Sequence, residues 1–161
     1  MIYTCSHKNY NSNKFKTYAI SGNRGKDANY NGESFNILAP KLRFWKIWHN
    51  NIGKIDEKIN NYYYIDEYYK HVLMNLSPIE FYKQLDNSIL LCYENNYEFC
   101  HRHIVSAWLE LKLNIPVLEV KVDNNTITFL QRPAYIKDYL IEIMNKYNDN
   151  DLNCKKYQKV K

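Results

Sequence analysis

No apolar run in this chain is long enough to span a membrane, and its first residues, MIYTCSHKNY, lack the pattern of a signal peptide. Only four cysteines are present, and none of them forms a CxxC pair. They are Cys5, Cys92, Cys100 and Cys154. From these absences we expect a cytoplasmic protein with reduced thiols and no membrane contact, in the host cytoplasm if the gene is viral.

A strong charge is also missing, because 22 basic and 17 acidic residues leave a formal net charge of +5. This mildly basic balance fits an anionic small ligand, whereas nucleic acid is not the expected partner. The lysines are scattered except in the tail CKKYQKVK (154–161). With 161 residues, 45% of them apolar, we expect one domain over 1–150 and a basic, flexible tail over 151–161. The abundance of Tyr, Asn, Lys and Ile suggests an AT-rich genome, as in a low-GC bacterium or its phage.

Hydrophobic patterning predicts alternating strands and helices. Strands are expected at 1–6, 16–22 and 88–93, and as a hairpin at 117–123 and 126–130; helices are expected at 38–51, 55–76, 77–85, 97–113 and 135–147. The run SILLCY (88–93) is typical of a buried central strand. The pattern indicates a mixed α/β fold in which helices cover a short, mainly parallel sheet.

Helix boundaries are marked by capping residues. Asp56 is suited to begin the helix over 55–76, and Ser77 followed by Pro78 is suited to begin the next one. In the longer helix, the three- and four-residue spacing that starts at Ile55 and Ile59 predicts the inward face.

The segment CYENNYEFCHRH (92–103) places two thiols, two imidazoles and a guanidinium between the central strand and a helix. Ligands in α/β proteins bind at such junctions. Asn95 and Glu98 resemble a capping box for this helix. The positive helix terminus and Arg102 would favour a thiolate or a bound anion.

Several kinds of chemistry are open to this segment. A phosphatase-type loop is disfavoured, because Ser106 stands where an arginine is needed. A metal site could use Cys92, Cys100 and His103, although no paired-ligand spacing supports it. In a Cys–His pair, His103 or His7 would be a better base for Cys100 than the adjacent His101, because neighbouring helix residues face different directions. The alternative is that Cys100 is simply a buried apolar residue.

A second candidate is the loop GNRGKDANYNGES (22–34). Its Gly22, Arg24, Gly25 and Lys26 could offer backbone amides and charge to a phosphate, although it matches neither a P-loop nor GxGxxG. An ordinary flexible loop is the equally weighted alternative.

The stretch SILLCYENNYEFCHRHIVSAWLE resembles the signature of the uncharacterised DUF488 family, in which an apolar strand and a CYE turn precede Cys-His-Arg and an apolar helix. MIYTCS (1–6), Ser21 and LAP (38–40) also fit this resemblance, which covers about residues 1–120. It implies a compact, Rossmann-like, three-layer α/β domain. It also implies that seven residues gather near one pocket: Ser21, Arg24, Cys92, Glu94, Cys100, His101 and Arg102.

Three functions are therefore carried forward. The first is a protein that binds a nucleotide-type or other anionic small molecule, and that sequesters a nucleotide immune signal if it is phage-encoded. Its expected ligand-binding residues are Ser21, Arg24, Tyr93, Glu94, His101, Arg102 and His103. The second is an enzyme acting on nucleotides or nucleic-acid components with Cys100 or Glu94 as the catalytic group. The third is a structural or partner-binding protein. No cofactor is expected, and a homo-oligomer is compatible with the sequence.

Overall fold

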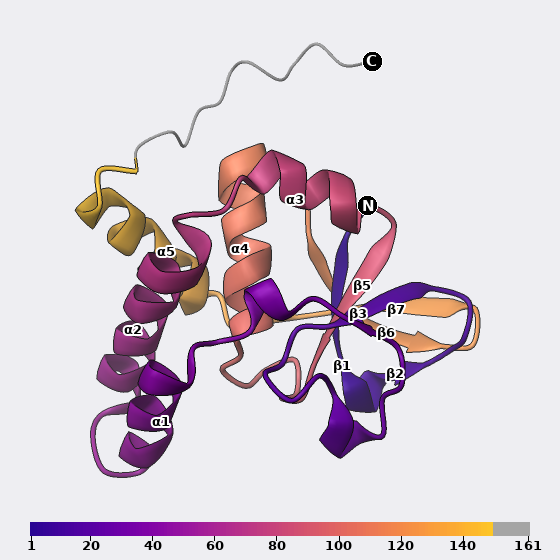
Figure 1. Cartoon of the computed structure of the whole chain (residues 1–161), viewed down its shortest axis with the longest axis horizontal. Helices are drawn as coiled ribbons and strands as arrows, with labels where there is room; N and C mark the ends of the chain where they lie inside the picture. The colour runs from indigo at the N-terminus through magenta and orange to yellow at the C-terminus, as the bar shows by residue number, and fades with distance from the viewer. Residues whose placement is uncertain (150–161) are drawn as a thin grey trace.

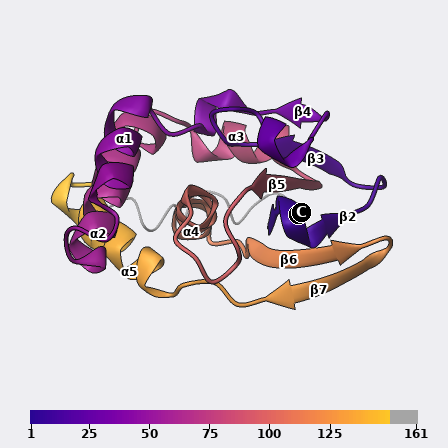
Figure 2. The same cartoon turned by 90° about the horizontal axis from the view of Figure 1, so that it is seen from below.

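The computed structural model describes residues 1–149, and its centre is a curled, mostly parallel sheet (Figures 1 and 2). The strands are β1 (Tyr3–Ser6), β2 (Tyr10–Asn11), β3 (Lys16–Ala19), β4 (Glu33–Ser34), β5 (Ser88–Cys92), β6 (Leu118–Asp123) and β7 (Thr126–Leu130). Their order is β2-β6-β1-β5-β3-β4, and β7 pairs antiparallel with β6. The predicted Rossmann-like α/β fold with a C-terminal hairpin and helix is thus confirmed. The predicted tail over 151–161 and Cys154 lie outside the described residues.

The helices pack against this sheet and against one another. They are α1 (Leu42–Asn51), α2 (Glu57–Tyr68), α3 (Pro78–Leu85), α4 (His101–Leu113) and α5 (Tyr135–Lys146). Short helical turns occupy His7–Asn9, Lys26–Ala28 and Asn36–Leu38, and a π-helical turn over Tyr69–Leu73 continues α2. Figure 2 shows α4 between the sheet and the group formed by α1, α2 and α5. Because of this position, α4 is buried on two sides.

The predicted caps at Asp56 and Ser77 are confirmed, whereas the predicted Asn95–Glu98 capping box does not begin a helix. Asp56 accepts hydrogen bonds from the backbone of Lys58 and Ile59 at 2.9 and 3.1 Å, and the Ser77 hydroxyl accepts one from the amide of Glu80. Each cap satisfies amides at a helix start that have no partner within the helix.

The predicted inward face of α2 is wrong at its beginning, where Ile55 and Ile59 are exposed. Asn60 and Asn61 take the buried positions instead. Their amide groups donate to the Trp48 carbonyl at 2.9 Å and to the Tyr135 hydroxyl at 3.0 Å. These polar side chains can be buried because they form hydrogen bonds with residues of α1 and α5. The spacing of residues within α2 does not indicate such partners.

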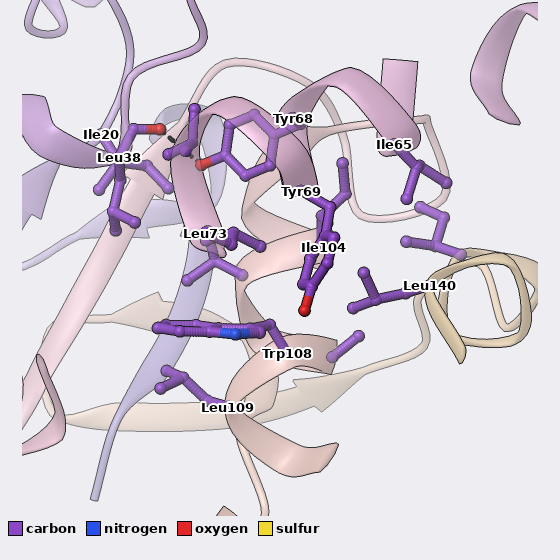
Figure 3. Packing of buried hydrophobic residues seen from close by; sticks show 14 of the residues in the cluster. Ile20, Leu38, Ile65, Tyr68, Tyr69, Leu73, Ile104, Trp108, Leu109 and Leu140 are labelled. Carbon is purple, nitrogen blue, oxygen red and sulfur yellow. Dashed lines mark hydrogen bonds between the residues drawn. The ribbon is translucent and has the colours of Figure 1, made fainter. Parts of the chain in front are cut away.

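Most of the apolar core lies between α4 and the helices around it. Figure 3 shows Trp108 of α4 among buried side chains that include Tyr68, Tyr69 and Leu140. A smaller cluster, which includes Cys5 of β1, is formed by strand residues. Within residues 1–149, no helix combines the length and the apolar character needed to cross a bilayer.

Candidate functional site at the carboxyl ends of the strands

A cavity of about 630 Å³ opens where β3 and β5 end and α4 begins. Parallel strands of this kind of sheet bring the loops that follow them to one edge. Sixteen residues line the cavity: Ser21, Gly22, Asn23, Asp27, Ala39, Pro40, Leu42, Trp45, Trp48, Tyr64, Cys92, Tyr93, Glu94, Phe99, Cys100 and His101. Six predicted site residues are therefore brought together here, namely Ser21, Cys92, Tyr93, Glu94, Cys100 and His101.

Two thiols and an imidazole form the inner polar end of this cavity. The sulfurs of Cys92 and Cys100 and a ring nitrogen of His101 all lie within 4.8 Å of one another. His101 Nδ1 is 3.7 Å from the Cys92 sulfur, and a carboxylate oxygen of Glu94 is 3.3 Å from the same sulfur. We call Cys92, Cys100 and His101 the thiol–imidazole cluster.

Cys100 reaches this position because α4 begins at His101, four residues later than predicted. Cys100 is the N-cap and has an extended backbone, whereas Asn95 and Glu98 close a separate turn before it. The expectation that Cys100 and His101 face apart is wrong, since it assumed that both were inside the helix. His101 joins the two cysteines, and His103 does not line the cavity.

Burial and mutual contact shift the acidities of these groups. Burial alone would raise the pKa of Cys100, but the hydrogen bond from Cys92 and the charges of Arg102 and His101 lower it well below the usual thiol range. Burial and the charge of Cys100 raise the pKa of Glu94 to about 7. The site thus places a stabilised thiolate beside a carboxyl group able to exchange a proton near neutral pH.

Aromatic side chains from α1, α2 and the turn before α4 also line the cavity. Trp48 lies 5.2 Å from Tyr64 and 5.4 Å from Phe99, measured between ring centroids. Trp45 stacks on His49 at 4.8 Å, yet 36% of it stays exposed at the cavity. Sequence reasoning had placed the two tryptophans only in a helix, because helical spacing does not tell which cavity a residue faces.

The loop after β3 is held to Tyr93 by hydrogen bonds. The Tyr93 hydroxyl donates to the side-chain oxygen of Asn23 and accepts from the amide of Asp27 at 3.2 Å. Ser21 and Asn23 both accept from the amide of Gly25, at 3.0 and 3.2 Å. This network orients Asn23 and Asp27, which also line the cavity. Ser21 and Tyr93 therefore shape the site from both of its loops.

The amides of Arg24, Gly25 and Lys26, three of the four predicted to hold a phosphate, are engaged within the loop. Arg24 donates its amide to the Ser21 carbonyl at 3.0 Å, and Lys26 donates its amide to the Asn23 carbonyl at 3.3 Å. The Arg24 guanidinium faces the side-chain oxygen of Asn36 at 3.0 and 3.1 Å. Arg24 thus lies outside the residues that line the cavity.

Arg102 and His103 point to the sheet side of α4. The guanidinium of Arg102 is fully buried and donates to Glu119 of β6 at 3.0 and 3.2 Å. Thr4 donates to the same carboxylate at 2.7 Å, and His103 Nε2 lies 3.6 Å from it. Sequence reasoning did not select Glu119. Its signal in the sequence was weak, because Glu119 alternates with apolar residues in the same way as Lys121 and Asp123 of this strand, which are exposed.

The comparisons with known proteins do not identify a relative. No family model, curated protein or solved structure matches this chain. Its resemblance to DUF488 therefore remains a prediction based on the Cys-His-Arg segment.

Proposed function

We propose that this protein binds a small molecule carrying a nucleobase or a similar planar ring in the cavity between α1, α4 and the loop after β3. The observation that carries the proposal is a cavity lined by several aromatic side chains together with hydrogen-bonding groups. Aromatic side chains bind bases by stacking, and polar groups at fixed positions select the base edge.

The size and polarity of the cavity support a ligand of this kind. Its volume of about 630 Å³ lies in the range of roughly 300–1,000 Å³ that is usual for small-molecule sites. Asp27 and Glu94 offer carboxyl acceptors to the ring N–H and amino groups of a base.

The proposal rests on the ring of the ligand rather than on a phosphate. Among residues 1–149, no lysine or arginine lines the cavity, and the two arginines selected from the sequence have partners elsewhere. We therefore expect nucleosides to bind about as well as the corresponding monophosphates, since no lysine or arginine at the described cavity can pair with the extra charge.

A binding experiment tests the proposal directly. Isothermal calorimetry with the four ribonucleosides and their monophosphates should find at least one that binds with one site per chain. Mass spectrometry of the recovered ligand would then show whether it is chemically changed. Absence of binding by every nucleoside and nucleotide would contradict the proposed function.

Replacing Trp45 by alanine should weaken the ligand found in that panel by about 1–3 kcal/mol, or roughly 5- to 150-fold, because one stacking surface is lost. Trp45 is already partly exposed, so the fold should tolerate the change. Phe129→Ala is the matched control, because Phe129 is an exposed aromatic residue on β7 that does not line the cavity. Equal affinities for wild type and Trp45→Ala would argue against stacking on this side chain.

A further inference from the structure

The thiol–imidazole cluster has the composition and the spacing of a metal site. Thiolates and imidazoles are the protein ligands that zinc prefers. The sulfurs of Cys92 and Cys100 and a nitrogen of His101 lie within 4.8 Å of one another, although the three residues come from two segments of the chain. Within residues 1–149, this is the only group of three His, Cys, Asp or Glu side chains with such a convergence.

Distances agree with tetrahedral coordination. Zn–S bonds of about 2.3 Å and Zn–N bonds of about 2.0–2.1 Å place neighbouring ligand atoms about 3.5–3.8 Å apart in a tetrahedron. The Cys92 sulfur and His101 Nδ1 are 3.7 Å apart. The largest separation in the cluster, at most 4.8 Å, requires only a small inward shift of a side chain.

The His101 ring is held in the state that a ligand needs. Its Nε2 lies 3.0 Å from the carbonyl oxygen of Ile20. A carbonyl only accepts hydrogen bonds, so Nε2 carries the hydrogen and Nδ1 is the nitrogen that can coordinate a metal. Nδ1 and Nε2 lie 3.7 and 3.8 Å from the Cys92 sulfur, so the ring has to turn for the Nδ1 lone pair to point at an ion between the ligands. Metal-bound histidines are usually oriented by this kind of second hydrogen bond to a backbone carbonyl or a carboxylate.

We propose that Cys92, Cys100 and His101 bind one zinc-type divalent cation and leave its fourth coordination position open to the cavity. All three side chains line the cavity wall, so a water molecule or a ligand in the cavity can reach this position. Glu94, whose carboxylate is 3.3 Å from the Cys92 sulfur, lies beside the same site. The metal site does not depend on the proposed nucleobase ligand, and it makes Cys100 a ligand rather than a free nucleophile.

Metal content tests the proposal without reference to activity. Untagged protein purified from zinc-supplemented cells should contain about one zinc per chain by plasma mass spectrometry. After removal of zinc with a chelator, one equivalent of Co²⁺ should give the visible absorption of a tetrahedral ion and a sulfur-to-cobalt charge-transfer band. Wild-type protein that binds neither ion stoichiometrically, or binds Co²⁺ without the sulfur band, would overturn the proposal.

The variants assign the ligands. Cys92→Ser and Cys100→Ser should each reduce zinc content at least tenfold, while Cys5→Ser and Cys154→Ser should retain it. Cys5 is a useful control, because it is equally buried but belongs to the strand cluster. Circular dichroism checks that each variant is folded. If the ligand variants do not fold, the sulfur-to-cobalt band of the wild-type protein still tests whether cysteine binds the metal. Retention of zinc by folded Cys92→Ser and Cys100→Ser would show that the metal binds elsewhere.

Discussion

Replacing Glu119 by glutamine is expected to lower the free energy of unfolding by about 3–5 kcal/mol, because it removes one partner of a fully buried ion pair. The Glu119 carboxylate accepts hydrogen bonds from Arg102 and Thr4, and all of these groups are shielded from water. A neutral amide would leave the Arg102 guanidinium charged and without a counterion. Urea denaturation monitored by circular dichroism gives the difference directly.

Glu67→Gln is the matched control, since Glu67 also pairs with an arginine but that partner, Arg43, is largely exposed. An exposed pair of this kind should contribute no more than about 1 kcal/mol. Equal losses in the two variants would contradict a special role of the buried pair. Arg102→Met combined with Glu119→Leu should recover much of the stability, because it removes both charges together.

The same ion pair gives the protein a defined sensitivity to acid. Burial alone would raise the pKa of Glu119, but the His103 imidazole, with Nε2 3.6 Å from the carboxylate, and the charge of Arg102 lower it. A lowered carboxyl pKa contributes stability above the unfolded value of about 4.3, and the contribution is lost as the pH falls through the folded value. The difference between wild type and Glu119→Gln should therefore shrink in denaturation experiments below about pH 4.

Trp108→Ala is expected to cost about 3–5 kcal/mol, because it removes the largest fully buried side chain. The indole packs edge-on against Phe81, with ring centroids 6.0 Å apart, and lies among the core side chains in Figure 3. The surrounding helices cannot collapse fully into the space, so a cavity adds to the lost burial. Thermal and urea unfolding both report the change.

The same substitution at an exposed position is the control for this prediction. Trp45→Ala removes an identical side chain from α1, where it is partly exposed, and should change stability by less than about 1 kcal/mol. A similar cost at both positions would contradict a special contribution of core packing at Trp108, because the gain in helix propensity from Trp to Ala is the same at both.

Local sequence was sufficient for several elements of the fold. The apolar run of β5 predicts a central buried strand, and all five of its residues are buried between β1 and β3. Asn124 permits the left-handed backbone (φ +53°) of the tight turn that joins β6 to β7, so the hairpin was predictable from the turn itself. These features depend on residues that are neighbours in the chain.

Part of the site followed from the same local reasoning. Glu94 and His101 come directly after the predicted strand or at the start of the predicted helix, and both line the cavity. Ser21 lies at the end of the second predicted strand and reaches the same edge, because β3 and β5 are parallel neighbours. Sequence thus located the site from the rule that ligands bind at strand ends.

Only the tertiary structure shows which of the candidate side chains lie at the cavity and which point elsewhere. Arg102 lies in the Cys-His-Arg segment, but its side chain pairs with Glu119 of β6 instead of lining the cavity. This is possible because β6 lies beside β1 in the sheet. Likewise, Trp45 and Trp48 reach the cavity because α1 lies across it, although they are more than forty residues from Cys92 in the chain. Periodicity determines which residues share a face of a helix. What that face contacts depends on packing between segments that are distant in the chain. A charge can be buried there only beside a counterion, and an apolar surface is stable only where other apolar groups cover it.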